Sequence, residues 1–209
     1  MGQLISLSER RADRSRPSNS DRATFFFDLA CPFSYLAAER VERLLGDVEW
    51  VPASTVSRPE TVAAARARAE LRAAELRLPL VWPDRYPDCV PGALRVAARA
   101  AENGGGSRFA LAAARLGFCG GFDLEDPEIL AEAAAAAGMP LEQCLRAAGD
   151  SSLDLALEAT ARGLASRGVT ELPAVRIGRR WFAGESGLTE AAAMRRALVT
   201  YGGPLAPVG

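Results

Sequence analysis

Histidine and lysine are both absent from this chain of 209 residues, so all 25 of its basic side chains are arginines. The lack of histidine excludes histidine metal ligands, Ser-His-Asp triads and Cys-His catalytic pairs. If the chain is an enzyme, its proton transfers must use thiols, hydroxyls, carboxylates or a cosubstrate.

Cysteine is scarce, and long apolar runs are missing. The four cysteines are Cys31, Cys89, Cys119 and Cys144, and their spacing matches neither a zinc motif nor a dense disulfide framework, so no metal is expected. No apolar run has the length of a transmembrane helix, and the N-terminus lacks the apolar core of a signal peptide. The sequence therefore predicts a cytoplasmic protein with free thiols and no membrane partner.

Charge of one sign is not in excess, because the formal net charge is only -1. This balance favours neither nucleic acid nor an anionic membrane as a partner. Mixed charges and serines predict a disordered tail over residues 1–22, and glycine and proline predict a flexible tail over 202–209. The hydrophobic content of 49% suits one compact domain with a large insertion.

The stretch from Phe25 to Leu36 carries the strongest signal for chemistry. It reads Phe-Phe-Phe-Asp-Leu-Ala-Cys-Pro-Phe-Ser-Tyr-Leu, an apolar run typical of a buried strand followed by a helical pattern. Pro32 suits the first helical position, so Cys31 is predicted to be the N-cap. The positive end of the helix dipole would stabilise a thiolate there and lower the thiol pKa. We expect Cys31 to be a nucleophile, with a small buried cysteine at a strand end as the alternative.

Strand and helix signals alternate only near the two ends of the chain. Strands are predicted at 24–29 and 48–52 around a helix at 32–45, which gives a right-handed parallel crossover. Two further strands at 174–177 and 180–182 precede a closing helix at 188–198. The pattern predicts an α/β fold with a four-stranded mixed sheet.

A helical block lies between these βαβ and ββα halves. Its helices are expected to begin at the N-caps Ser57, with Glu60 completing a capping box, Ser107 and Asp126. The two strands that follow the block are joined by Gly178-Arg179, a two-residue turn of the glycine-first kind.

Four segments together resemble one enzyme family. They are residues 25–37, 78–87 (Leu-Pro-Leu-Val-Trp-Pro-Asp-Arg-Tyr-Pro), 121–130 (Gly-Phe-Asp-Leu-Glu-Asp-Pro-Glu-Ile-Leu) and 168–178 (Gly-Val-Thr-Glu-Leu-Pro-Ala-Val-Arg-Ile-Gly). In this order they are similar to the 2-hydroxychromene-2-carboxylate isomerase family, which is related to kappa-class glutathione transferases.

The resemblance implies a thioredoxin-like fold in its DsbA-like form. Residues 23–56 and 169–201 would make up the thioredoxin-like domain, and residues 57–168 the inserted helical domain. It also implies glutathione or another low-molecular-weight thiol as cosubstrate and a small electrophilic, aromatic substrate. Relatives are commonly dimers, which leaves a homodimer open.

The resemblance also assigns roles to individual residues. The residues expected to react are Cys31, Ser34 and Pro173. The residues expected to contact the cosubstrate are Pro32, Trp82, Cys89, Leu172, Glu185 and Ser186. The bond from Leu172 to Pro173 is expected to be cis, which would leave the backbone groups of Leu172 unpaired and able to bind glutathione or a peptide as an added strand. An ordinary proline at the start of a strand is the alternative.

The chain departs from the family pattern at several positions. Cys31 stands where most isomerase and kappa members have serine, while Ser34 stands where DsbA relatives have a second cysteine. Cys89 stands where the family has a glutathione-binding asparagine, and Ser186 and Gly187 replace an Asp-Arg pair. Ser34 can either hydrogen-bond to a sulfur at the site or merely cap the helix.

Cys89 suggests a hypothesis of its own. If the loop folds as in the family, Cys89 lies near Cys31 and the two can form a reversible disulfide; an idle Cys89 is the alternative. Trp82, Tyr86 and Phe33 are expected to line an apolar pocket. The two other cysteines, Cys119 and Cys144, are expected to be packing residues.

Three functions are consistent with these residues. The first is a glutathione-linked isomerase or transferase acting on a small molecule. The second is a thiol–disulfide oxidoreductase that uses Cys31 with an external or distal resolving thiol. The third is a binding protein that kept the fold without catalysis.

Overall fold

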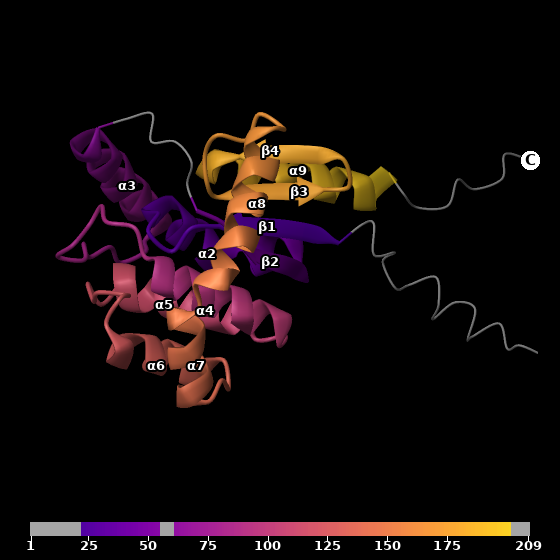
Figure 1. Cartoon of the computed structure of the whole chain (residues 1–209). Coiled ribbons are helices and arrows are strands. Elements are labelled where there is room, and N and C mark those ends of the chain that lie inside the picture. The colour runs from indigo at the N-terminus through magenta and orange to yellow at the C-terminus, as the bar shows by residue number, and fades with distance from the viewer. Residues whose placement is uncertain (1–21, 55–60, 202–209) are drawn as a thin grey trace, which may run out of the picture.

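The computed structural model describes residues 22–54 and 61–201 (Figure 1). Strand β1 (Ala23–Phe27) leads to helix α2 (Pro32–Leu45), which ends at Gly46, a residue with a φ of 72°. Strand β2 (Val48–Pro52) then pairs with β1 in parallel. This pairing confirms that the predicted crossover is parallel. Proline at N1 and glycine after the last turn define the two ends of α2.

The sheet within the described part of the chain has four strands in the order β2-β1-β3-β4. Strand β3 (Ala174–Ile177) is antiparallel to β1, and β4 (Arg180–Ala183) is antiparallel to β3. Gly178, at a φ of 57°, begins the turn between β3 and β4, since glycine adopts this conformation without steric cost. The predicted four-stranded mixed sheet is confirmed.

Helices fill the chain between β2 and β3, as predicted. They are α3 (Val62–Leu76), α4 (Pro91–Glu102), α5 (Gly106–Phe118), α6 (Pro127–Ala136), α7 (Leu141–Gly149), a short 3-10 turn (Ser151–Leu153) and α8 (Asp154–Ala165). Asp126 caps α6 as expected, because its carboxylate accepts the Glu128 N–H at 2.8 Å.

Two predicted helix starts are wrong, and a third lies outside the described residues. The N-cap of α3 is Thr61, whose hydroxyl accepts the Ala64 N–H at 3.2 Å, while Ser57 and Glu60 lie outside the described residues. Ser107 lies inside α5, which is capped by Gly105 instead. The closing helix α9 runs from Gly184 to Tyr201 and so begins four residues before the predicted start.

One hydrophobic cluster joins the sheet to most of the helices. On one face of β1, Phe25 and Phe27 contact Trp50 of β2 and pack with buried residues of α2, α4, α5, α6 and α9. On the other face, Phe26 packs with Leu164 of α8, which Figure 1 shows crossing the sheet. The predicted tail at 1–22 lies outside the described residues except for Arg22, and the predicted tail at 202–209 lies outside them entirely.

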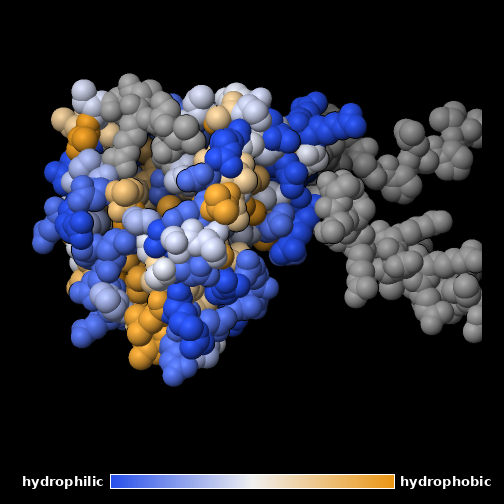
Figure 2. Space-filling view, in the orientation of Figure 1, coloured by the Kyte–Doolittle hydropathy of each residue, from blue (hydrophilic) through white to orange (hydrophobic). Residues whose placement is uncertain are grey.

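The surface is mostly hydrophilic, with some apolar area (Figure 2). An orange strip marks the lower part of this view, where Figure 1 places α6 and α7. The exposed large apolar side chains of α7 and α8 are Leu141, Leu145 and Leu155. Among the described helices, none is both long and apolar enough to span a membrane.

Candidate functional site

Cys31 lies where the two halves of the sheet meet. It is the N-cap residue of α2, with extended backbone angles (φ -103°, ψ 116°), and its N–H donates to the Asp28 carbonyl at 3.1 Å. Its thiol donates to the backbone carbonyl of Leu172 at 3.3 Å, across 141 residues of sequence. The bond from Leu172 to Pro173 is cis, as predicted.

The pKa of the Cys31 thiol moves in the direction opposite to the prediction. The N–H groups of Phe33 and Ser34 and the Ser34 hydroxyl lower the pKa, as expected at a helix start. Burial and the nearby charge of Asp28 outweigh them and raise the pKa from 9.0 to about 11. Cys31 keeps part of its surface exposed, but the low-polarity surroundings of its sulfur determine the direction of the pKa shift. The resting form is therefore a neutral thiol.

Ser34 links the thiol to the end of β1. Its side chain is buried, hydrogen-bonds to the Cys31 sulfur, and accepts the Asp28 N–H at 3.1 Å. The Asp28 carboxylate accepts the Ala30 N–H at 2.9 Å. These bonds order the turn between β1 and α2, so Ser34 contacts the sulfur as one of its two predicted roles requires.

The backbone carbonyl of Leu172 is not unpaired, contrary to the prediction. It accepts the Cys31 thiol proton, so the carbonyl has a partner within the chain. Leu172 and Pro173 are both buried. Any strand added at this edge has to replace the thiol as the donor to this carbonyl.

The space next to Cys31 is narrow. A crevice lined by Asp28, Leu29, Cys31, Ser34 and Phe118, among others, has no room for a water molecule. Leu29 and Phe118 also line a surface pocket with a cavity volume of about 30 Å³.

The surface pocket contains one of the predicted contacts. Ala30, Tyr86 and the exposed Cys89 line it. Cys31 and Cys89 are both free thiols, so the proposed disulfide between them stays a prediction. Trp82 is not among its lining residues.

Trp82 and Phe33 are instead covered by arginines of α3. The Arg66 guanidinium lies 4.8 Å from the Trp82 ring centre, and that of Arg68 lies 4.1 Å from the Phe33 ring centre. Of the three aromatic residues expected to line a pocket, Tyr86 lines this surface pocket, and Trp82 and Phe33 do not line it. The sequence could not show that α3 supplies the covering side chains.

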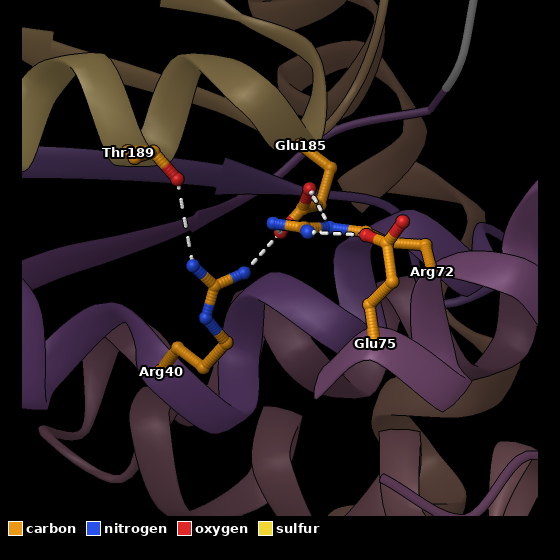
Figure 3. Close-up of polar contacts among 5 residues, drawn as sticks. All are labelled: Arg40, Arg72, Glu75, Glu185 and Thr189. Atoms are coloured by element: carbon orange, nitrogen blue, oxygen red, sulfur yellow. Dashed lines mark hydrogen bonds and ion pairs between the residues drawn. The ribbon is translucent and has the colours of Figure 1, made fainter. Parts of the chain in front are cut away.

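Glu185 already has two partners within the chain. It lies in the first turn of α9, is buried, and forms ion pairs with Arg40 of α2 and Arg72 of α3 (Figure 3). A cosubstrate at this position would have to compete with these two guanidinium groups, and the predicted contact of Glu185 with the cosubstrate stays a prediction. Ser186 beside it is exposed.

A known domain family accounts for this geometry. The model of the DSBA-like thioredoxin domain matches residues 23–194. The chain belongs to the DsbA-like thioredoxin domain family. The match includes both Cys31 and the cis Pro173. No curated protein sequence matches the chain.

Solved structures resemble this DsbA-like chain over most of its length. A 2-hydroxychromene-2-carboxylate isomerase has a TM-score of 0.73 at 14% identity, covering 88% of this chain and 100% of its own. A probable DsbA oxidoreductase from Streptomyces coelicolor has a TM-score of 0.68 at 21% identity, covering 90% and 93%. The cytosolic disulfide reductase DsbM from Pseudomonas aeruginosa, solved with GSH, has a TM-score of 0.63 at 18% identity, covering 86% and 99%. At such identities these likenesses support the fold, and the DsbA-like fold predicted from the sequence is confirmed.

The other two cysteines of this DsbA-like chain differ in their surroundings. Cys144 is fully buried, and burial raises the pKa of its thiol, which agrees with the predicted packing role. Cys119 is partly exposed, and its sulfur lies 2.9 Å from the Tyr35 hydroxyl, which also donates to the Pro79 carbonyl at 2.8 Å. Burial and the Cys119 contact raise the pKa of Tyr35. No sequence signal indicated this contact.

Glu125 forms one wall of the surface pocket and caps α4. Its carboxylate accepts the N–H groups of Gly92 and Ala93 at 3.2 and 3.1 Å. We expect Glu125→Ala to lower the free energy of unfolding by about 1–2 kcal/mol, since it leaves these donors without their acceptor. Urea denaturation checks this value. Glu125→Gln, which keeps an acceptor oxygen, should lose clearly less; equal losses would show that the cap is not the cause.

Proposed function

We propose that this chain is a thiol-dependent enzyme in which Cys31 carries out glutathione-linked thiol–disulfide exchange. One observation carries the proposal: the Cys31 sulfur lies 3.3 Å from the Leu172 carbonyl, beside the cis Pro173. This places a sulfur nucleophile of the chain itself next to a backbone acceptor. A cosubstrate with a cysteinyl backbone, such as glutathione, presents an N–H to such an acceptor.

The chemistry is two successive exchanges. The Cys31 thiolate attacks the sulfur of a mixed disulfide between a small molecule and glutathione; the small molecule leaves as a thiol, and Cys31 becomes bound to glutathione. A glutathione thiolate then attacks this mixed disulfide, giving oxidised glutathione and free Cys31. Because residue 34 is serine, no neighbouring thiol on the same helix turn competes for the second step.

The contact between the Cys31 thiol and the Leu172 carbonyl has a role in these two exchange steps. When Cys31 loses its proton, the Leu172 carbonyl loses its donor and can accept an N–H of the incoming cosubstrate. The Ser34 hydroxyl and the N–H groups of Phe33 and Ser34 stabilise the charge on the sulfur. Binding of the cosubstrate and ionisation of the thiol thus favour each other.

Support also comes from relatives on this fold. The disulfide reductase DsbM was solved with GSH. The exchange needs a reducing compartment that supplies glutathione, which is in keeping with the cytoplasmic location expected from the sequence.

A second candidate is glutathione-linked isomerisation or conjugation of a small aromatic electrophile. The apolar residues Leu29, Tyr86 and Phe118 of the surface pocket favour it, because such a substrate needs an apolar surface. In that reaction the sulfur of glutathione attacks the substrate, and Cys31 only positions it.

The test begins with the reduced protein and oxidised glutathione. We expect mass spectrometry of peptides to find glutathione on Cys31, removable by reduced glutathione, and we expect the protein to catalyse reduction of a cysteine–glutathione mixed disulfide. Modification of Cys89 alone, without turnover, would overturn the proposal. Glutathione-dependent consumption of an unsaturated aromatic ketone, without disulfide turnover, would select the second candidate.

A further inference from the structure

Arg66 of α3 lies against two aromatic rings of the loop that follows this helix. Its guanidinium carbon is 4.8 Å from the Trp82 ring centre and 5.5 Å from the Tyr86 ring centre. The two ring centres are 4.6 Å apart, and the Trp82 Nε1 atom donates to Glu70 at 2.8 Å, which orients the larger ring. The cation–π contacts therefore hold the Arg66 guanidinium in one position.

Arg66 differs from the arginines around it in having no ion-pair partner among the described residues. It forms no salt bridge within 22–54 and 61–201, and its buried Nε atom has no hydrogen-bond partner there. By contrast, Arg72 on the same helix is paired with Glu185, and Arg85 in the following loop is paired with Asp123. Buried polar groups in native proteins are nearly always hydrogen-bonded, so Arg66 lacks the acceptor that such a cation normally has.

The Nη groups of Arg66 are the part of the side chain that a ligand can reach. The side chain is partly exposed, while its Nε atom is buried. Two Nη donors at the end of a planar guanidinium match the two oxygens of a carboxylate. Because the rings already hold the guanidinium, binding a carboxylate costs little further side-chain entropy.

The rings beside Arg66 connect it to the Cys31 site. Tyr86 and Phe118 both line the surface pocket, and Phe118 also lines the crevice that contains Cys31. Ala30, the residue before Cys31, lines the same surface pocket. A ligand that is joined to Cys31 and extends into this pocket therefore meets the Tyr86 ring, which Arg66 contacts. Glutathione, an extended tripeptide about 10 Å long, carries a carboxylate at each of its ends.

We propose that Arg66 is a binding residue for a carboxylate of the ligand that reacts at Cys31. This inference rests on the proposed function, because it takes a mixed disulfide of glutathione as that ligand. The carboxylate comes from glutathione itself or from the other half of the mixed disulfide. Either source forms a charge-assisted pair with the Arg66 guanidinium, so the site prefers acidic thiols to neutral or cationic ones.

The first arm of the test measures binding without chemistry. S-methylglutathione cannot exchange disulfides, and we expect calorimetry to show that Arg66→Met binds it about tenfold or more weakly than wild type. Arg66→Met keeps the aliphatic stem that packs on the rings, and Arg66→Lys, which keeps the charge without the planar fork, should give an intermediate affinity. In the wild type, an equal loss of affinity on esterifying the glycyl carboxylate assigns that carboxylate to Arg66, while an unchanged affinity assigns the glutamyl one.

The second arm measures the other half of the mixed disulfide. Turnover of cysteine–glutathione disulfide is compared with that of cysteamine–glutathione disulfide, which lacks the carboxylate of the cysteine half. If Arg66 binds this carboxylate, wild type prefers the cysteine compound by about tenfold in kcat/KM. Arg66→Met then loses the preference, while its affinity for S-methylglutathione equals that of wild type.

Arg162→Met of α8 is the matched control, because it removes an exposed arginine that is paired with Glu158 at 3.1 Å. It should leave the affinity and the preference at their wild-type values. If Arg66→Met changes neither quantity, or if Arg162→Met changes them equally, the carboxylate site is overturned. That failure leaves the exchange reaction standing, because the reaction is read from the glutathione adduct on Cys31 of the wild-type protein. A wild type that forms no such adduct but binds S-methylglutathione through Arg66 would remove the exchange reaction and keep the site.

Discussion

A Cys31→Ser variant is expected to lose glutathione-linked disulfide reduction by on the order of 10³-fold or more, the scale on which enzymes lose rate without their covalent nucleophile. The physical reason is that a serine hydroxyl cannot form the mixed disulfide on which both exchanges depend. Turnover of a cysteine–glutathione mixed disulfide, measured with excess reduced glutathione, checks the value.

The matched control is Cys89→Ser, which alters the exposed cysteine of the neighbouring pocket. It should keep the wild-type rate unless Cys89 acts as the distal resolving thiol, in which case turnover falls at low glutathione and recovers at high glutathione. Full activity of Cys31→Ser would contradict the exchange mechanism. In that case the reacting sulfur would be that of glutathione. The same holds for members of the family that the sequence resembles, most of which have serine at this position.

The raised pKa of Cys31 predicts that the thiol contributes to the free energy of unfolding by an amount that depends on pH. Because the pKa rises from 9.0 to about 11 on folding, the folded state binds more protons than the unfolded state between these values. The contribution of the neutral thiol is therefore fully present below pH 9 and is lost as the pH rises toward 11. The loss amounts to up to about 2–3 kcal/mol, and to less insofar as solvent reaches the thiol.

Comparison with Cys31→Ser isolates this contribution. Other groups with raised pKa values, such as Tyr35 and Cys144, titrate in both proteins and cancel in the difference. Urea denaturation at pH 8 and at pH 10.5 should show wild type losing more stability than the variant by roughly that amount. A constant difference between the proteins would mean that the thiol is hydrated in the folded state.

The fold was predictable where its signals are local. Proline at residue 32 and glycine at 46 delimit α2, and the Gly178 turn defines the hairpin of β3 and β4. The predicted start at Ser107 failed because Ser107 and the glycines before it are nearly equivalent caps locally. At this start the selected cap was Gly105, and a Cβ on Gly106 would lie 2.9 Å from Ala101.

The candidate site was predictable in its identity and not in its electrostatics. Cys31 and the cis Pro173 follow from sequence motifs, and the structure brings them together. The pKa of Cys31 depends on burial by segments far apart in the chain, which a helix-dipole argument leaves out. The partners of Glu185 are Arg40 and Arg72, 145 and 113 residues away, and no spacing rule connects them.

The sheet and the helical block bury their apolar side chains in one continuous cluster. Phe25 of β1, Leu36 of α2 and Phe109 of α5 belong to it together. Neither half retains a complete interior without the other, so the block is not a detachable module whose loss would leave a smaller thioredoxin. If this block were exchanged between relatives, its buried surface would have to fit the buried surface of the recipient sheet. This packing requirement restricts recombination more strongly than the choice of the two chain junctions does.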